Sequence, residues 1–585
     1  MSATKENNFC NEVSLEDYVC RILILGTTEN TYSSSASRKI DKYSISFLEQ
    51  QIQAGNGQKI LNVVEEIFIS GRAPKQEMTL MTHAMLCRAE DINLRKNALQ
   101  LVSKYRTLAQ LYLWKTFHAD VPNADGEKSK GYGRAVKRVI NEWIFQQTPR
   151  QLAYQLTKYP HRHKWGIKQI MQCAHPKSGS GDDRVFPPAK KNETQTPLTD
   201  ATPIDLVLRY AVNGYKEMKK LAKKYDLKAT PEYKYLKAVN WAKTNRAMDE
   251  PNRAYLIKLI QKHTLTREQI STEGLALLDV QKALLLDETM TKVTMPLTAL
   301  LRNLANLTRF GVFADNAILN VVVKHLLNPD IIKKARVHPV NVLLAWFTYK
   351  AGEGERGKHK WNPHLELVKG LEEMFYLSFQ TLKPTGERLC VLIDASGSMS
   401  SPSACKVISN AEAAALLAMG IARAEANSAN PVQHSFYIFT AADGRKTGTG
   451  LTDVSDLIHA DASFENVLDA VQRSDWGQTD ISLGITEAAK FNRRYDAFIV
   501  ITDNDVNSGI KPSFALDYYR GKMKMETKLA VIACQATNFS IADTNDKGMM
   551  DFVGFDSHLP KLLQQFIART ADASDDFQEA EDEAE

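Results

Sequence analysis

The sequence predicts two architectures in one chain, a helical solenoid followed by a doubly wound α/β domain. From about Tyr43 to Gln380, apolar residues recur at the three- and four-residue spacing of amphipathic helices. Beyond that region, short apolar runs alternate with helical segments, which is typical of a mostly parallel sheet covered by helices. At 585 residues the chain is also too long for one ordinary hydrophobic core.

The helical part is expected to consist of short helices joined by brief polar or proline-containing loops. After a helical beginning over 43–68, the helix-like stretches are 76–88, 92–103, 105–117, 131–145, 149–158, 165–174, 202–225, 231–243, 251–262, 274–286, 295–308, 315–327, 340–350 and 364–380. Paired short helices without strands are typical of a HEAT-type α-solenoid, although no fixed-period repeat can be found. Residues 176–200 are rich in Pro, Gly and Ser and predict an exposed loop.

The pattern changes at residues 382–386. We divide the chain into a flexible N-terminal arm (1–15), a helical module (16–383), an α/β domain (384–570) and an acidic disordered tail (571–585). Strands of the α/β domain are expected at 388–394, 434–440, 496–502 and 528–534, and helices near 404–425, 462–473, 481–491, 512–522 and 557–569.

The net charge of +6 hides an uneven distribution. Residues 1–383 contain 57 Lys and Arg against 38 Asp and Glu, a net charge of +19. Residues 384–570 have a net charge of −5, and the tail has −8. A strongly basic module indicates a polyanionic partner such as nucleic acid. We interpret the acidic tail as a segment that maintains solubility.

The seven cysteines are scattered and form no C-x-x-C pair. This usage predicts a reduced intracellular protein without a disulfide framework or zinc site. No apolar run reaches membrane-spanning length, and the N-terminus lacks the features of a signal peptide, so we expect no membrane partner. We expect the protein in the cytoplasm and allow for a nuclear pool.

The stretch 391–400, VLIDASGSMS, predicts a metal site at the end of a buried strand. Alternate residues of an extended segment point the same way, so Asp394, Ser396 and Ser398 can converge on one point. One carboxylate and two hydroxyls make an oxygen-only set that suits a divalent cation, and we expect Mg²⁺. The alternative is a strand followed by a serine-rich loop and a helix N-cap.

Two later residues favour the metal interpretation. Thr479 lies in a turn-rich loop, and Asp503 follows a second apolar run, 497–501. Open α/β sheets place their sites at the carboxyl ends of strands, so both acids should meet at one edge. Together the five residues resemble the metal-ion-dependent adhesion site of von Willebrand factor A domains. The resemblance implies that the hydroxyls ligate the ion while the acids act directly or through water.

The densest basic and aromatic patch begins at Lys158 and includes Arg162, Lys168 and His175. Lys and Arg can neutralise phosphates, and neighbouring Tyr, His and Trp can stack on unpaired bases. The alternative is a solvated loop between helices. A second patch places Arg134 and Lys137 near the start of a helix, where backbone N–H groups also attract phosphate.

Five segments carry a resemblance to a known family. They are GYGRAVKRVINEW (131–143), MPLTALLRNL (295–304), KKARVHPVNVLLA (333–345), GKHKWNP (357–363) and CVLIDASGSM (390–399). The sequence resembles the Ro autoantigen family over about residues 15–570. That family joins a TROVE module of HEAT-like helices to a von Willebrand factor A domain. The resemblance implies a helical ring closed by the A domain.

The same resemblance implies a ribonucleoprotein that acts in RNA quality control. Y RNAs would bind the outer surface, and Lys158, Arg162 and His175 match the family's Y RNA contacts. Misfolded noncoding RNAs, such as defective 5S rRNA precursors, would insert a single-stranded end into the ring. The 176–200 loop looks longer than is usual in the family.

We expect no enzymatic activity, because the sequence contains no Walker loop, H-E-x-x-H motif or nucleophile elbow. The metal would instead keep an open coordination position for a carboxylate of a protein partner. Two other functions remain open at this point. One is a protein-binding adhesion scaffold without RNA specificity, which the basic excess disfavours. The other is a Mg²⁺-dependent nuclease, which would need more acids around Asp394.

Overall fold

The computed structural model describes most of both predicted parts of the chain. The described residues are 11–12, 14–25, 42–73, 76–121, 133–163, 165–176, 201–246, 249–335, 337–354, 359–378, 384–400, 409–426, 428, 432–440, 450–472, 479–503, 508–534, 539–543, 545–554 and 559–567. The acidic tail and nearly all of the predicted 176–200 loop lie outside them.

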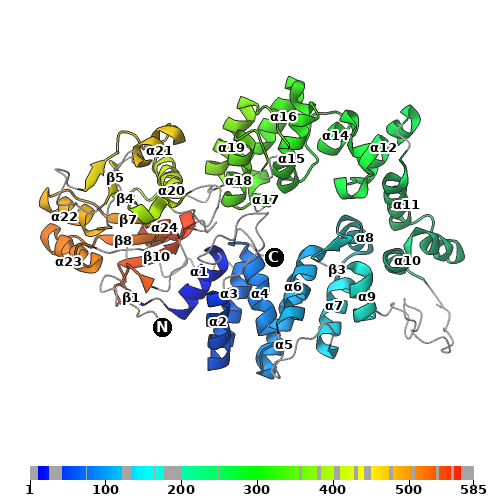
Figure 1. Ribbon diagram of the computed structural model, residues 1–585, viewed down its shortest axis with the longest axis horizontal. Coiled ribbons are helices and arrows are strands. Elements are labelled where there is room, and N and C mark those ends of the chain that lie inside the picture. Colours follow the sequence, from blue (N-terminus) through cyan, green and yellow to red (C-terminus); the bar gives the residue numbers. More distant parts are fainter. Residues whose placement is uncertain are drawn as a thin grey trace.

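Helices make up almost all of the described chain up to residue 378, and they follow one another around an arch (Figure 1). They are α1 (Leu15–Leu25), α2 (Lys42–Gln51), α3 (Gly57–Ser70), α4 (Glu77–Leu86), α5 (Ile92–Gln100), α6 (Leu108–Asp120), α7 (Arg134–Gln146), α8 (Pro149–Lys158), α9 (Ile167–Ala174), α10 (Pro203–Lys224), α11 (Pro231–Thr244), α12 (Glu250–His263), α13 (Thr272–Leu275), α14 (Leu278–Leu285), α15 (Leu297–Arg309), α16 (Asn316–Leu326), α17 (Pro329–Ala335), α18 (Pro339–Lys350) and α19 (Leu365–Leu377). The predicted solenoid is confirmed.

Local sequence signals explain where several helices begin. Thr148 precedes α8, and its hydroxyl accepts from the Gln151 backbone N–H while the Gln151 side chain accepts from the Thr148 N–H. This reciprocal capping satisfies backbone donors that the first turn leaves free. In α10, Gly214 has φ of 81°, and the helix is kinked there. Glycine tolerates this conformation because it has no Cβ.

The N-terminal segment departs from the predicted flexible arm. Asn11–Glu12 forms β1, which pairs antiparallel with β9 (Phe539–Ser540) in the α/β domain. α1 follows, and its Val19 and Ile22 side chains are fully buried. β1 lies within the predicted arm and is stabilised by a distant strand, whereas α1 begins at the end of the arm and belongs to the predicted helical module.

A small hairpin also interrupts the helices, where a plain loop was expected. β2 (His161–Arg162) pairs antiparallel with β3 (Trp165–Gly166), so Arg162 lies opposite Trp165. His163 in the turn has a left-handed φ of 49°. The hairpin is anchored on α6, because Tyr112 Oη donates to the Tyr159 carbonyl (3.1 Å) and Thr116 Oγ1 donates to the His163 carbonyl (2.8 Å).

The C-terminal part contains the predicted doubly wound sheet, with strand order β10-β8-β7-β4-β5-β6. The strands are β4 (Leu389–Asp394), β5 (Ser435–Phe439), β6 (Leu451–Asp453), β7 (Ala497–Thr502), β8 (Lys528–Ala533) and β10 (Met549–Val553). The helices are α20 (Asn410–Glu425), α21 (Phe464–Gln472), α22 (Ser482–Lys490), α23 (Pro512–Met523) and α24 (Leu559–Ile567). Every strand pair is parallel except β5–β6. The four predicted strands are confirmed, whereas the edge strands β6 and β10 were missed.

The first helices of the arch contact one side of the α/β domain. Arg21 of α1 lies 3.4 Å from Asp551 of β10, and both side chains are largely buried. Across the arch itself, His338 Nε2 lies 2.9 Å from the backbone oxygen of Arg72. The beginning and the end of the helical module therefore meet each other as well as the sheet domain.

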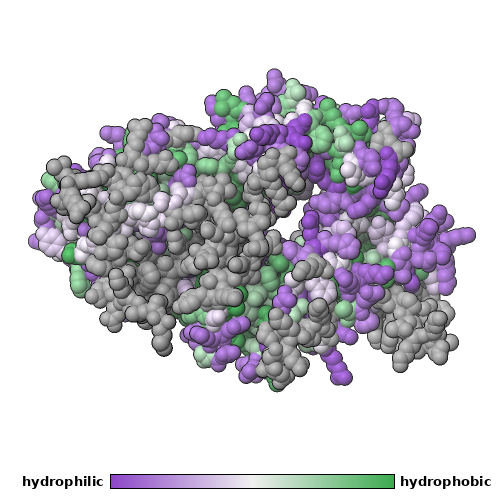
Figure 2. Space-filling model, in the orientation of Figure 1, coloured by the Kyte–Doolittle hydropathy of each residue, from purple (hydrophilic) through white to green (hydrophobic). Residues whose placement is uncertain are grey.

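The last helices of the arch contact another side of the α/β domain. Arg423 of α20 donates to Glu373 of α19 over 2.8 Å. Trp346 and Phe347 of α18 pack edge-on against Phe464 of α21, with ring centroids 5.8 and 5.7 Å apart. The α/β domain thus closes the arch into a ring. Figure 2 shows an opening through the molecule to the right of its centre.

Two hydrophobic clusters stabilise this arrangement. One cluster runs without a break from the helical module into the sheet face covered by α20, α21 and α24. The other fills the opposite sheet face beneath α22 and α23. Because the larger cluster crosses between the two parts, their relative position is set by apolar packing as well as by the polar contacts. None of the described helices is long and apolar enough to cross a membrane.

Candidate metal centre and nucleic-acid interface

The predicted metal residues gather at the carboxyl end of the sheet, beside its central strand. β4 ends at Asp394, and β7 beside it ends at Thr502, one residue before Asp503. β5 and β7 lie on opposite sides of β4, and the chain passes from the β5–β6 side to the β7 side, which makes this edge a topological switch point. The sequence signal that predicted this position was the acid that directly follows each apolar run.

Hydrogen bonds hold the Asp394 carboxylate in place. Its Oδ2 accepts from Thr502 Oγ1 (2.5 Å), and its Oδ1 accepts from the Ser396 backbone N–H (2.8 Å). Ser396 Oγ and Ser398 Oγ lie 3.0 Å apart. The end of β4 and the 3₁₀ turn that follows it (Gly397–Ser400) bring the three predicted ligands together, although Ser398 does not lie in an extended segment as expected. Thr502 adds a hydroxyl from the neighbouring strand that we had not singled out.

The other two predicted ligands come from loops on the β7 side. Thr479 is 1 % exposed and immediately precedes the α22 region. Its carbonyl oxygen accepts from the backbone N–H (3.2 Å) and the hydroxyl (3.0 Å) of Ser508, five residues beyond Asp503. Asp503 is 3 % exposed. The loop carrying Thr479 is thus tied to the segment that follows Asp503.

Two buried acids, Asp394 and Asp503, lie near each other at this edge and determine its electrostatics. Burial, with a further contribution from the nearby Asp503, raises the pKa of Asp394 to about 7. Cys534, at the end of β8, is also fully buried, and burial together with both acids raises its thiol pKa. Two acids buried side by side are costly unless positive charge compensates them.

The donor set fits a hard divalent cation. It consists of carboxylates and hydroxyls, which are the ligands that Mg²⁺ takes in proteins. Within the described ranges, no cluster of three or more His, Cys, Asp or Glu side chains is placed to hold a metal. A soft-metal site of the zinc type therefore has no candidate there, whereas the hydroxyl-rich set at β4 remains suitable.

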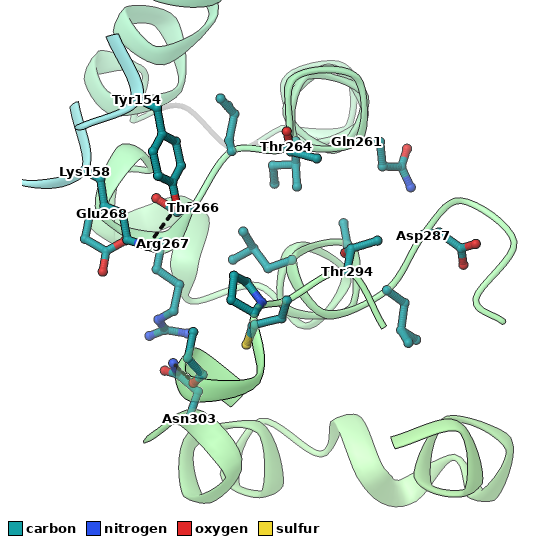
Figure 3. A pocket seen from close by; sticks show the side chains of 18 of the residues that line it. Tyr154, Lys158, Gln261, Thr264, Thr266, Arg267, Glu268, Asp287, Thr294 and Asn303 are labelled. Atoms are coloured by element: carbon teal, nitrogen blue, oxygen red, sulfur yellow. Dashed lines mark hydrogen bonds between the residues drawn. The ribbon is translucent and has the colours of Figure 1, made fainter. Parts of the chain in front are cut away.

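The predicted RNA-binding residues do not form one uniform surface. Arg162, Lys168 and His175 are exposed, on β2, on α9 and at the end of α9. His175 caps α9 with a left-handed φ of 50°. Lys158 is different, because its Nζ donates to Tyr154 Oη (2.8 Å) and it lines a cavity (Figure 3).

Arg134 and Lys137 lie on the helix next to α9. Both are in the first turns of α7, where Arg134 is exposed and Lys137 is half-buried. Asn141 Nδ2 donates to the Ala174 carbonyl (3.2 Å), which joins α7 to the end of α9 that carries His175. The structure therefore places the second basic patch beside the first one.

A further basic surface escaped the sequence analysis. We name it the lysine stripe, and it consists of Lys216, Lys219, Lys220, Lys223 and Lys224 on the second half of α10. All five side chains are exposed. Their spacing of three and four residues puts them on one side of the helix. Figure 2 shows hydrophilic side chains projecting at the right-hand edge, where Figure 1 places α10 and α11. The lysine density around 216–224 was a readable signal, but it lacks the aromatic residues that drew attention to Lys158.

Comparison with known proteins agrees with both parts of the fold. A TROVE domain model matches residues 3–346, and a Ro60 vWA domain model matches residues 388–567. A relative from Caenorhabditis elegans named RNA-binding protein RO60 is 30 % identical, over 96 % of this chain and 90 % of its own. The chain belongs to the Ro60 family. The predicted resemblance to the Ro autoantigen is confirmed.

Two bacterial comparisons extend the Ro60 family assignment. A relative from Deinococcus radiodurans, also named RNA-binding protein RO60, is 29 % identical over 95 % of this chain and 93 % of its own. The crystal structure of the Deinococcus radiodurans RO (RSR) protein superimposes with a TM-score of 0.64 at 26 % identity. It covers 95 % of this chain and 99 % of that chain. Both members of the Ro60 family therefore match the helical module and the α/β domain together.

Proposed function

We propose that this RNA-binding protein of the Ro60 family holds small noncoding Y RNAs and misfolded noncoding RNAs in a ribonucleoprotein particle for RNA quality control. The observation that carries the proposal is the exposed basic surface of the helical module, at Arg162, Lys168 and Arg134 and along the lysine stripe. Such a surface binds phosphates with little dependence on base sequence. Two relatives that match nearly the whole chain are named RNA-binding proteins, which supports it.

In this proposal the two RNA classes use different features of the ring. Structured Y RNAs bind the outer surface through Lys158, Arg162 and His175. Misfolded RNAs, such as defective 5S rRNA precursors, insert a single-stranded end into the ring opening. A ring of this kind selects for a free end because a chain without one cannot be threaded. The closed arch and its opening support this route.

The α/β domain has a separate role in the proposal. Asp394, Ser396, Ser398, Thr479 and Asp503 would hold a divalent cation, most simply Mg²⁺. The ion would supply positive charge that compensates the two buried acids, and an open coordination position for a carboxylate of a protein partner. We assign the protein a binding function without catalysis, and we place it in the cytoplasm with a nuclear pool.

Competition between the two RNA classes tests the function. In the triple variant Lys158→Ala, Arg162→Ala, His175→Ala, the Kd for a Y-type stem-loop should increase at least tenfold, because several phosphate contacts disappear together. The variant should retain a duplex with a 3′ single-stranded tail. Lys262→Ala, which removes an exposed charge from α12, is the matched control. Equal losses for both RNAs would replace the two-surface proposal with one continuous site, and no binding of either RNA by the wild type would refute RNA binding.

A protein-binding scaffold is the second candidate, and the metal residues are the observation that favours it. It predicts that RNA affinity is weak at physiological salt and that Mg²⁺ promotes capture of a carboxylate-bearing protein. Sequencing of co-purified RNA, set against identification of co-purified proteins in Mg²⁺ and in chelator, separates the two candidates.

A further inference from the structure

A cavity of about 420 Å³ opens where α8 meets the segment between α12 and α15 (Figure 3). Its apolar lining includes Leu284, Leu286 and Met295, which are at most 6 % exposed. Thr264 ends α12 in a left-handed conformation with φ of 51°, and the chain turns there along the cavity wall. The volume lies in the usual range of small-ligand sites.

One side of the cavity is cationic. Lys158 donates to Tyr154 Oη, and its Nζ lies 5.1 Å from the Tyr154 ring centroid. Burial opposes the charge of Lys158, but the Tyr154 hydrogen bond and nearby acidic groups raise its pKa overall, so it stays charged. Arg267 donates to the neutral Gln281 Oε1 over 2.8 Å. Both cations thus hydrogen-bond to uncharged partners, and the Glu268 carboxylate lies on the same side of the cavity. Burial lowers the pKa of Arg267, and Glu268 opposes that change.

The opposite side is acidic and fixed in place. Asp287 Oδ1 accepts from the backbone N–H groups of Thr291 and Lys292, and its Oδ2 accepts from Thr289 Oγ1. Figure 3 shows Lys158 and Arg267 on one side of the cavity and Asp287 on the other. Asn303 lines the cavity too, and its Nδ2 donates to the Ala299 carbonyl, which leaves its oxygen as an acceptor. The cavity therefore has a cationic side, an apolar lining and an acceptor side.

We propose that this cavity binds one unpaired nucleotide of an RNA held by the protein. The phosphate lies against Lys158 and Arg267, the base covers the apolar lining, and an exocyclic amino group donates to the acceptor side. This distribution disfavours a polyphosphate, which Asp287 would repel, and a purely apolar ligand, which would offer no counter-charge to the two cations. RNA-binding proteins commonly take up unstacked bases in this way.

The position of Lys158 connects this cavity to the basic patch. Arg162 is four residues further along the chain, at the exposed hairpin, so an RNA backbone on that surface passes close to the cationic side. The inference rests on the proposed RNA-binding function and adds a base-binding position to it. Sequence reasoning had assigned Lys158 only to backbone contacts.

A fluorescent base scan tests the proposal. The probes are stem-loop and 3′-tailed RNAs with one 2-aminopurine placed at each unpaired position in turn. Wild-type protein should change the fluorescence strongly at one position. Ala299→Phe should block the cavity and Arg267→Gln should remove one cation, and both should abolish that change. RNA affinity should fall by about tenfold, the usual effect of losing a charged contact. The control Lys262→Gln removes an exposed charge from α12 outside the cavity.

The outcomes separate this proposal from the general function. The cavity proposal is overturned if the protein binds RNA but no 2-aminopurine position changes its fluorescence, or if the change persists in Arg267→Gln. Either result leaves RNA binding itself intact. Failure of wild-type protein to bind any of the RNAs refutes the function itself. Titration with the four nucleoside monophosphates is the last arm. Affinity for one of them equal to that for RNA would identify a metabolite site and overturn the proposal.

Discussion

At the scale of single residues, the arrangement around Asp394 depends on which atoms are already engaged. Both of its oxygens accept hydrogen bonds, one from Thr502 and one from the Ser396 backbone. The serine hydroxyls, in contrast, are paired with each other over 3.0 Å. A cation that took up these two hydroxyls would leave the Thr502 and backbone contacts of Asp394 in place.

Ser396→Ala should therefore weaken Mg²⁺ binding without unfolding the domain. The substitution removes one hydroxyl ligand and keeps the backbone N–H that bonds to Asp394. We expect at least a tenfold increase in the Kd for Mg²⁺, measured by calorimetry, with unchanged affinity for a 3′-tailed RNA. Ser400→Ala is the matched control, because its exposed hydroxyl only contacts the Gly397 carbonyl. Equal effects of the two variants, or a parallel loss of RNA affinity, would contradict the assignment.

At the residue scale, the sequence predicted side-chain positions correctly where the strand order alone decides which residues meet. Asp394 and Asp503 could be paired from the sequence because each follows an apolar run, and parallel strands deliver both to one edge. Lys158 could be recognised as basic but not as a cavity residue. Its partner Tyr154 is one helical turn away, but the other walls come from 260–303, and no local pattern encodes that contact.

At the scale of elements, the lysine stripe on α10 shows how charge and helix geometry combine. Its only carboxylate contact among the described residues is the 2.7 Å ion pair of Lys220 with Glu217. An exposed pair of this kind contributes little stability. The stripe follows the kink at Gly214, beyond the half of α10 that buries Leu206 and Val207. Concentrated like charge repels itself, and a bound polyanion relieves that repulsion.

Replacing Lys219, Lys223 and Lys224 by Gln should weaken RNA binding in a salt-dependent manner. Each lost phosphate contact reduces the slope of log K against log salt by about 1, so the triple variant should lose about 3. Filter binding from low to moderate salt measures this slope. The control is a second triple variant that removes the same amount of charge from exposed positions of the α/β domain, with Gln in place of Arg494, Lys522 and Lys524. An unchanged slope in the stripe variant would exclude α10 from the RNA interface.

Element prediction was reliable for long periodic segments and failed for short ones. Helices such as α8 and α11 carry several apolar residues at helical spacing plus a Thr-Pro start, so their limits are readable. The hairpin at 161–166 has two residues per strand, too few for any period. It forms because α6 anchors the segment before its first strand, at Tyr159, and its turn, at His163. β1 likewise exists only because β9 pairs with it.

At the scale of the whole molecule, the ring is closed by contacts of unlike chemistry. The α18–α21 contact is aromatic and insensitive to pH, whereas the α1–β10 contact places Arg21 against Asp551. Burial raises the pKa of Asp551 to about 7, although Arg21 opposes that change. Only the second contact should respond to pH near neutrality, so opening of the ring would begin on the α1 side.

Asp551 should contribute a loss of stability as pH rises from about 4 to about 7. Over that range the unfolded chain releases the Asp551 proton while the folded chain keeps it, so each pH unit costs up to about 1.4 kcal/mol. Asp551→Asn mimics the protonated carboxyl and should remove this contribution, so the Tm of the variant should rise relative to that of the wild type as pH increases from about 4 to about 7. Asp517→Asn, at an exposed carboxylate on α23, should keep the wild-type slope. If the Asp551→Asn profile kept that slope, another group would be responsible. The wild-type profile also contains the opposite effect of the buried His83 and His118, whose pKa values burial lowers. Only the difference between Asp551→Asn and wild type therefore tests Asp551, and parallel profiles would mean that Arg21 holds Asp551 ionised.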